Sequence, residues 1–216
     1  MVYDLDGDGA LETYEPGLPN WEIYIDANNN EQWDNGETKA ATDANGEYQL
    51  DDLAPGFYTL RRVPQAGWQQ TFPAGVGKHT INIRNATQEI VGINFAEQRL
   101  FTPFTAGNIL VTRSSFVDND LLLEYTPDGQ LVQALVIPGT SDTSRLIAKD
   151  LVMDGLGQLQ IFNGYDDVRL TTFNPITADF SETLVPEWDM GQTFDQWGDI
   201  AAFGNYVFAN EQIADG

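Results

Sequence analysis

The amino-acid sequence predicts an all-β protein in two parts: a β-sandwich of about 100 residues, followed by an incomplete β-propeller of two to three blades. Three observations support this prediction. Short β-branched or aromatic stretches alternate with turn residues in the first part, strand motifs repeat in the second, and no convincing amphipathic helix is found in either. The predicted parts are residues 1–98 and 105–216, joined by a short linker at 99–104.

The first part is divided into strands by Gly, Pro, Asn and Asp. The predicted strands are WEIYIDA (21–27), GEYQLDD (46–52), GFYTLRRV (56–63), HTINIRN (79–85) and EIVGINFA (89–96). Asn45-Gly46 and Pro55-Gly56 supply turn chemistry, because Asn and Gly tolerate positive φ and Pro fixes φ at a negative value. This spacing of short strands and turns predicts an antiparallel sandwich.

The second part repeats a strand motif. GNILVT (107–112) recurs as GQLQIF (157–162) and GNYVFA (204–209), at offsets of 50 and 47 residues. DLVM (150–153) and DIAA (199–202) precede the second and third copies. A period of this size in an all-β segment is that of a propeller blade. Two blades and part of a third cannot close a ring, so we expect the chain to be a piece of a longer protein.

Composition restricts the classes of partner. The chain holds 33 acidic and 10 basic side chains, a formal charge of −23, which disfavours nucleic acid and anionic lipid. Residues 1–52 alone hold 14 carboxylates and a single base, Lys39. Cysteine is absent, so disulfides and thiolate metal sites are excluded, and no apolar run is long enough to insert into a membrane. We expect no signal peptide in this segment, because Met1-Val2-Tyr3-Asp4 leads directly into an acidic stretch.

The acidic stretch DLDGDGALETYE (4–15) matches the spacing of a calcium loop. Such a loop places oxygens at positions 1, 3, 5, 7, 9 and 12 and a Gly at position 6. Numbering from Asp4 assigns these positions to Asp6, Asp8, the carbonyl of Ala10, Glu12 and Glu15, with Gly9 at position 6. Ca²⁺ takes six to eight oxygen ligands, and every position here offers one.

A second loop follows in DANNNEQWDNGE (26–37). The same numbering gives the ligand candidates Asp26, Asn28, Asn30, the carbonyl of Gln32, Asp34 and Glu37. Glu31 stands where Gly is expected, so a bulkier residue must make the turn. Two neutral amides replace carboxylates, which predicts weaker binding than in the first loop. The alternative for both stretches is a pair of solvated acidic turns.

Residues 2–98 resemble the B-type repeat domains of serine–aspartate-repeat surface adhesins, relatives of the collagen-adhesin B-type fold. The resemblance is carried by the two loops, EPGL (15–18), TDANGEY (42–48), LAPGFY (53–58) and PQAGW (64–68). It implies a Greek-key, prealbumin-like β-sandwich that calcium stiffens and that serves as a stalk on secreted or wall-attached proteins. It also implies that Asp43 helps to hold calcium, although a role in a hairpin turn is equally open. Residues 105–216 are similar to NHL or lyase-like propellers, with EYTPDG (124–129) as a turn.

No catalytic site is evident. His79 is the single histidine and lies in a predicted strand, and neither a nucleophile elbow nor a phosphate-binding glycine loop occurs. Paired carboxylates for glycoside cleavage remain an alternative, with Asp166-Asp167 more typical of a blade turn. Trp188 and Trp197 are the tryptophans best suited to a sugar platform, although packing within blades is favoured. A Lys–Asn isopeptide bond, found in some relatives, is disfavoured because only Lys39 and Lys78 are available.

The sequence therefore predicts a calcium-stabilised, non-catalytic structural or adhesion module of an extracellular or cell-surface bacterial protein. Two alternatives remain. In one, residues 1–98 present a propeller with lyase-like or hydrolytic activity, and in the other the whole protein binds a host or matrix protein or a glycan.

Overall fold

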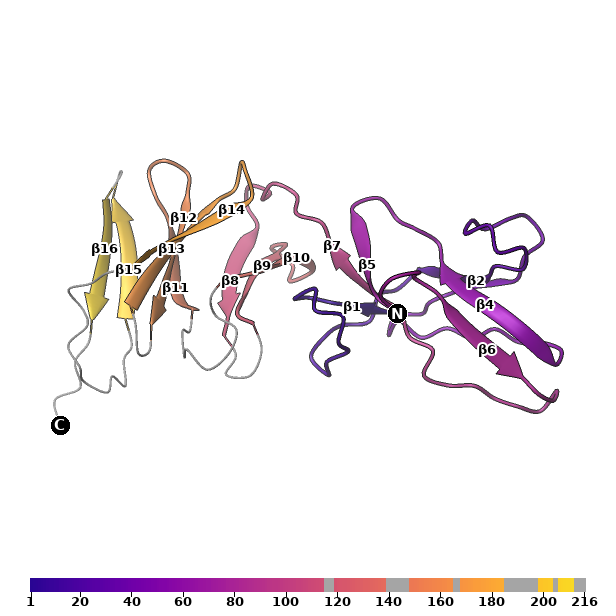
Figure 1. The fold of residues 1–216 in the computed structure, drawn as a ribbon. Coiled ribbons are helices and arrows are strands. Elements are labelled where there is room, and N and C mark those ends of the chain that lie inside the picture. The colour runs from indigo at the N-terminus through magenta and orange to yellow at the C-terminus, as the bar shows by residue number, and fades with distance from the viewer. Residues whose placement is uncertain (115–118, 139–147, 165–167, 185–197, 204–205, 212–216) are drawn as a thin grey trace, which may run out of the picture. The chain divides into compact units, whose positions relative to one another are not determined.

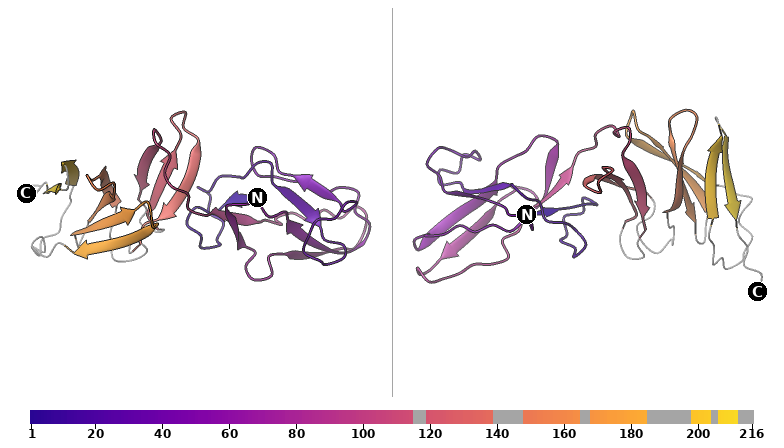
Figure 2. Two further views of the ribbon diagram at one scale, coloured as in Figure 1. Left: turned by 90° about the horizontal axis from the view of Figure 1, so that it is seen from above. Right: turned by 180° about the vertical axis from the view of Figure 1, so that it is seen from behind.

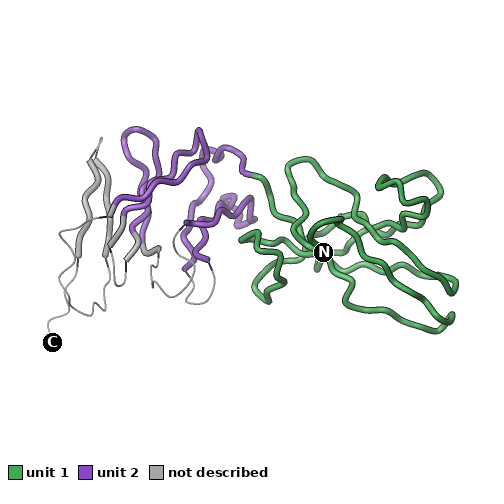
Figure 3. The backbone as a smooth tube through the Cα atoms, viewed as in Figure 1, with its two compact units in different colours: residues 1–100 green, residues 101–216 purple. Residues whose placement is uncertain are grey.

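The fold consists of β-strands joined by turns and loops. The structure is a computed structural model, and it describes residues 1–114, 119–138, 148–164, 168–184, 198–203 and 206–211. Over these residues the predicted all-β class is confirmed, and they include no helix of the length and apolarity needed to cross a membrane. The chain divides into unit 1, Met1–Leu100, and unit 2, Phe101–Gly216 (Figure 3). The division lies within the segment expected to connect the two parts.

Unit 1 contains two sheets (Figure 1). Sheet B has the order β3-β2-β4-β6, with β2 at Glu22–Ile25, β3 at Lys39–Ala41, β4 at Gly56–Arg62 and β6 at His79–Ile83. Sheet A has the order β1-β7-β5, with β1 at Val2–Tyr3, β5 at Trp68–Phe72 and β7 at Ala96–Arg99. The neighbours are antiparallel except for β1 and β7, which run parallel. That pair departs from the expected antiparallel arrangement.

The expected strands are found in part. Those at 21–27, 56–63 and 79–85 correspond to β2, β4 and β6, whereas 46–52 and 89–95 form no strand. Asp52 and Gly92 adopt positive φ values of 57° and 75°, which take the backbone out of the extended region. The two segments are linked instead by a side chain, because the Tyr48 hydroxyl donates a hydrogen bond to the Ile93 carbonyl at 2.7 Å. The alternating sequence pattern of 46–52 and 89–95 therefore reflects partly buried side chains, without the backbone hydrogen bonds of a β-ladder.

The core of unit 1 lies where the two sheets meet. Trp21 and Ile23 are buried, and the Trp21 ring meets the Trp68 ring of β5 edge-on at 5.5 Å. His79 lies in β6, as expected for a strand residue; it packs edge-on against Phe95 at 4.9 Å, and its Nε2 donates to the Asn94 carbonyl at 2.6 Å. Such aromatic contacts add to the stabilisation from apolar burial.

A buried ion pair also joins the two sheets of unit 1. Arg62 of β4 donates through Nε to Glu97 of β7, whose side chain is fully buried. Burial raises the pKa of Glu97 to about 7, and the Arg62 guanidinium opposes that rise. A buried carboxylate next to a guanidinium is stable only while both partners are present.

Within its described residues, unit 2 contains three sheets, seen from two further directions in Figure 2. The first holds β8 (Ile109–Arg113), β9 (Leu121–Tyr125) and β10 (Leu131–Val136), and the second holds β11 (Ala148–Met153), β12 (Leu159–Gly164), β13 (Val168–Asn174) and β14 (Asp179–Leu184). The third holds β15 (Gly198–Phe203) and β16 (Tyr206–Glu211). The repeated motif falls on β8, β12 and β16, each of which pairs with its neighbours in an antiparallel manner. None of these sheets closes on itself within the described residues.

The start of unit 2 is fixed to its first sheets. Phe101 and Phe104 pack against a buried cluster formed by Leu122, Ile137, Leu159, Ile161 and Phe173. The buried carboxylate of Glu124 accepts hydrogen bonds from the Thr105 backbone and the Asn108 amide, both at 2.8 Å. These contacts satisfy a charge that would be costly to bury alone. Asp166, Asp167, Trp188 and Trp197 lie outside the described residues.

Candidate metal centre

Loop 1, residues 4–15, begins directly after β1 and folds around its first side chain. Asp4 is fully buried, and its carboxylate accepts hydrogen bonds from the backbone N–H groups of Gly7 at 2.5 Å and Gly9 at 2.9 Å. Both glycines adopt left-handed φ values, 76° and 79°, which a Cβ would disfavour. The glycines therefore let the backbone turn tightly round the carboxylate of Asp4.

The end of loop 1 returns to its beginning through Glu15. Its Oε1 accepts a hydrogen bond from the Leu5 backbone at 2.8 Å, and its Oε2 accepts one from the Glu12 backbone at 3.2 Å. Asp6 and Asp8 cap the turns between, accepting from the N–H groups of Asp8 at 3.3 Å and Ala10 at 2.6 Å. The side chain at position 12 is thus held over the loop, where a calcium loop needs it.

The carboxylates of loop 1 converge. Ligand atoms of Asp4, Asp6 and Asp8 lie within 4.8 Å of one another, as do those of Asp6, Glu12 and Glu15. Asp6 belongs to both groups, so the loop brings together the five carboxylates predicted from the sequence. The Oε2 atom of Glu12 is buried and has no hydrogen-bond partner. A buried carboxylate oxygen without a donor is costly unless a cation neutralises it.

The electrostatics of loop 1 also favour a cation. Burial raises the pKa of Glu15 to about 8, and the neighbouring charges of Asp4 and Glu12 act in the same direction. Burial raises the pKa of Glu12 as well, together with the charge of Asp8. These carboxylates are therefore poorly stabilised as anions by the protein alone. An all-oxygen donor set of this charge suits a hard divalent ion.

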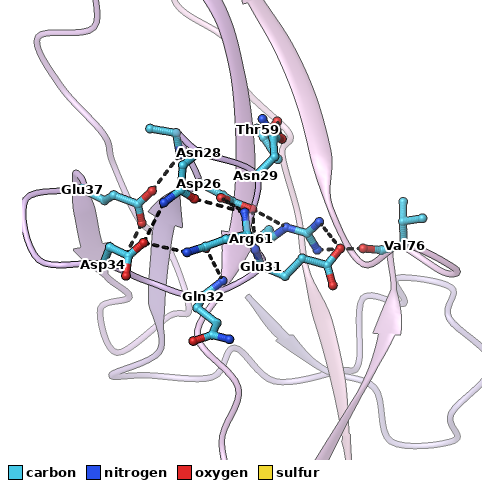
Figure 4. A network of polar contacts seen from close by, with 12 residues as sticks. Asp26, Asn28, Asn29, Glu31, Gln32, Asp34, Glu37, Thr59, Arg61 and Val76 are labelled. Atoms are coloured by element: carbon cyan, nitrogen blue, oxygen red, sulfur yellow. Dashed lines mark hydrogen bonds and ion pairs between the residues drawn. The ribbon is translucent and has the colours of Figure 1, made fainter.

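Loop 2, residues 26–37, follows β2, and Figure 4 shows its polar side chains together with Arg61. Asp26 accepts from the backbone of Asn30 and of Glu31, both at 3.1 Å. Glu37 accepts from the Ala27 backbone at 2.8 Å and from the Asp34 backbone at 3.0 Å. Position 12 is therefore bonded to positions 2 and 9 in both loops.

The backbone conformations of the two loops also agree. Asn29 and Glu31 have φ values of 56° and 67°, at the positions that Gly7 and Gly9 occupy in loop 1. The expectation that Glu31 makes a turn suited to Gly is confirmed. Asn28 and Asn30 cap the intervening turns, accepting from the backbones of Asn30 at 3.1 Å and Gln32 at 2.9 Å. The two loops thus share left-handed residues at positions 4 and 6, although only loop 1 has glycines there.

Loop 2 differs from loop 1 in how its side chains are satisfied. The amides of Asn28 and Asn30 both donate to Oδ2 of Asp34, at 2.8 and 2.7 Å. In addition, Arg61 of β4 donates to Asp26 at 2.9 Å. Within the described part of the chain, groups of three acidic ligands are found in loop 1 but not in loop 2. Two carboxylates of loop 2, those of Asp26 and Glu31, are therefore paired with a cation, and that of Asp34 accepts hydrogen bonds from two amides.

Asp43 lies in a turn, apart from both carboxylate groups. Its Oδ1 accepts hydrogen bonds from the backbones of Asn45 at 2.8 Å and Glu47 at 2.9 Å. These contacts describe a side chain that caps its own turn.

Sequence reasoning did not anticipate Arg61, and the only signal was a basic residue in a strand of an acidic unit.

Comparisons of the chain with protein-family models, curated proteins and solved structures found no match. The chemical role of the two loops is therefore inferred from their geometry. What the geometry offers is a set of oxygen donors, preformed by backbone hydrogen bonds and deficient in positive charge in loop 1.

Proposed function

We propose that this chain is a calcium-stabilised structural or adhesion module of a secreted or surface-attached bacterial protein, without catalytic activity of its own. Loop 1 would hold one Ca²⁺ through Asp4, Asp6, Asp8, Glu12, Glu15 and the carbonyl of Ala10. Loop 2 would offer a second, weaker site. The observation that carries the proposal is the buried, unpartnered Oε2 of Glu12 within a ring of carboxylates.

The finer fold belongs to the same proposal: unit 1 as a Greek-key, prealbumin-like sandwich of the B-type and unit 2 as part of a propeller. In unit 1 the resemblance gains support from a contact between two of its motifs. A Cβ on Gly17 of EPGL would lie 1.9 Å from the Asn45 carbonyl oxygen of TDANG. In unit 2, support comes from the repeated motif, whose three copies occupy β8, β12 and β16.

The expected energetic role of the ion is considerable. Extracellular calcium sites of this type have dissociation constants of about 10⁻⁴ to 10⁻³ M. At millimolar calcium, a site at the tighter end of that range adds about 1.4 kcal/mol to the free energy of unfolding. Since a domain is stable by only about 5–15 kcal/mol, that contribution is a substantial fraction of the total.

The first test measures calcium binding by the whole chain. Calorimetric titration of the metal-stripped protein is expected to show heat on adding Ca²⁺ and much less on adding Mg²⁺, which demands a smaller octahedral cage. Chelation is expected to lower the melting temperature. Absence of binding heat together with an unchanged melting temperature would contradict the proposal.

A single variant is expected to stabilise the metal-free protein and to weaken the stabilisation by calcium. Glu12→Gln removes one of the repelling charges of loop 1, so the metal-free protein should melt at a higher temperature. It also removes a ligand, so calcium should raise the melting temperature less than in the unaltered protein. Glu89→Gln makes the same chemical change at an exposed position outside the loops and should alter neither value. Equal behaviour of the two variants would count against a site in loop 1.

A further inference from the structure

Arg61 connects loop 2 to the rest of unit 1. Its side chain is only 9% exposed, and it lies on β4 opposite Tyr24 of β2. Its Nε donates to Asp26 Oδ2 at 2.9 Å, its Nη2 to Glu31 Oε1 at 2.8 Å and its Nη1 to the Val76 carbonyl at 2.9 Å (Figure 4). One guanidinium therefore holds positions 1 and 6 of the loop and the turn that carries Val76.

Four carboxylates of loop 1 lack an equivalent of this arrangement among the described residues. The ion pairs found among the described residues reach Asp26 and Glu31 but none of Asp4, Asp8, Glu12 or Glu15. The hydrogen bonds of positions 3, 5 and 12 correspond in the two loops, whereas position 1 accepts from positions 4 and 6 in loop 1 and from positions 5 and 6 in loop 2. The loops therefore differ at position 1, because Arg61 pairs with Asp26 and no ion pair among the described residues reaches Asp4. Their backbone conformations differ much less.

We propose that Arg61 is a built-in counter-cation for loop 2, and that loop 2 keeps its folded course without a metal ion because the guanidinium supplies the charge. The inference rests on the proposed function, in that it treats the loop as one shaped to hold a cation. Arg is suited to this role, since its fork of donors can bind two carboxylates at once and it stays charged at every relevant pH. Arg61 is here a positioning residue that acts through Asp26.

The same inference accounts for Glu31. A residue with a Cβ at left-handed φ is disfavoured, and loop 1 places Gly9 at the corresponding position. The carboxylate of Glu31 bonds to Arg61, an interaction that Gly could not make. The ion pair between Glu31 and Arg61 therefore maintains the unfavourable left-handed conformation of Glu31. Calcium added to the protein then acts chiefly on loop 1.

The test compares backbone hydrogen exchange in the whole chain, peptide by peptide, with EDTA and with calcium. In EDTA, the amides of 26–37 should exchange more slowly than those of 4–15, and calcium should slow the exchange of 4–15 far more. Arg61→Met should speed exchange of 26–37 in EDTA by about tenfold or more, the factor expected for loss of a charge-assisted hydrogen bond. Arg61→Lys should restore part of the protection, because it keeps the charge but not the fork.

Arg84→Met is the matched control, since Arg84 is exposed and lies outside both loops. It should leave the exchange of 26–37 unchanged. Unchanged exchange of 26–37 in Arg61→Met would overturn the inference, as would equal exchange of the two loops of the unaltered protein in EDTA. Should Arg61→Met unfold unit 1 as a whole, Glu31→Gln decides the matter, because the Glu31 side chain is 68% exposed and only the ion pair is weakened. Faster exchange of 26–37 in that variant supports the inference, and unchanged exchange overturns it.

The two proposals can fail separately. Calcium that protects neither loop and produces no binding heat would remove the proposed function. The comparison of Arg61→Met with the unaltered protein in EDTA involves no metal, so its outcome reports on Arg61 alone.

Discussion

Glu15 combines two roles that compete with each other. Its carboxylate closes loop 1 by accepting hydrogen bonds from the Leu5 and Glu12 backbones, which favours the charged form. Burial and the nearby acids have the opposite and larger effect, and they raise its pKa to about 8. In the metal-free protein at neutral pH, this side chain is therefore largely protonated. A bound cation would reverse the balance in favour of the anion.

Calcium binding is accordingly expected to release protons at neutral pH. The sign follows from the raised pKa of Glu15, which is about 4.5 in the unfolded chain and about 8 in the folded one. The free energy of unfolding of the metal-free protein therefore falls as the pH rises from about 4.5 through about 8, because Glu15 ionises less readily in the fold. An ion that needs the carboxylate displaces that proton, so calcium affinity should increase with pH over this window. Titration calorimetry in buffers of different ionisation enthalpy measures the release.

The control for this prediction is the pH itself. About two units above the pKa of Glu15 the proton is already lost, so the heat of binding should no longer depend on the buffer. Release of protons that persists unchanged at that pH would show that another group is responsible. A calcium affinity independent of pH across the window would contradict the assignment of Glu15 as a ligand.

At the residue scale, sequence spacing predicted the course of the loops but could not predict their partners. Four of the six ligand positions follow from local order. Asp4, Asp6 and Asp8 cap backbone groups two to five residues away, and Glu15 closes the loop. Arg61 is 35 residues from Asp26, and the two meet only because β2 pairs with β4. A contact of that kind depends on sheet register, which loop spacing does not encode.

At the scale of elements, a β-bridge residue and a turn of unit 1 meet at a point that has no room for a side chain. A Cβ on Gly17 would lie 1.9 Å from the backbone oxygen of Asn45, although the φ of Gly17 is not left-handed. Gly92 is the converse, with a left-handed φ of 75° and no atom within 4 Å of the added Cβ. The first glycine serves close packing, and the second serves backbone conformation.

These glycines give a matched pair of variants. Gly17→Ala should lower the free energy of unfolding of unit 1 by about 2–3 kcal/mol through overpacking against the backbone. Gly92→Ala should cost only about 1 kcal/mol, the price of a left-handed conformation. Chemical denaturation of the whole chain in the presence of calcium measures both. A smaller effect of Gly17→Ala than of Gly92→Ala would show that Gly17 is not packed against the Asn45 backbone as the structure describes.

The elements themselves were predicted unevenly. Strands with an alternating apolar pattern and a long ladder, such as β4, could be identified from the sequence. The short strands β1 and β3 could not, since two or three residues carry no period. The segment 46–52 was wrongly expected to be a strand because Tyr48 is partly buried through its ring, while its backbone makes no ladder.

At the scale of the whole molecule, the candidate ligands all lie in unit 1. Scanning calorimetry of the full chain is expected to resolve two unfolding transitions, of which chelation lowers one by several degrees. Glu12→Gln should remove most of that shift, and Glu89→Gln should preserve it. If both transitions moved together on chelation, metal binding would involve unit 2, contrary to the assignment of the ligands.

The division of the chain could be predicted because composition and repeat pattern both change near residue 100. The strand-by-strand match of the repeats was also readable from sequence, since β8, β12 and β16 begin with similar motifs. The attachment of Phe101 and Phe104 to the core of unit 2 was missed, because the short stretch 99–104 contains Pro103 and resembles a plain connection.

The parallel pairing of β1 with β7 has a mechanical consequence for unit 1. Tension applied to the two ends of the unit pulls these strands past each other along their length. The Val2–Phe95 and Asp4–Glu97 backbone bonds, at 2.9 and 3.0 Å, then share the load and do not open one after another. Asp4 is also the first residue of loop 1, so an ion held there would stabilise one end of the β1–β7 pair against extension.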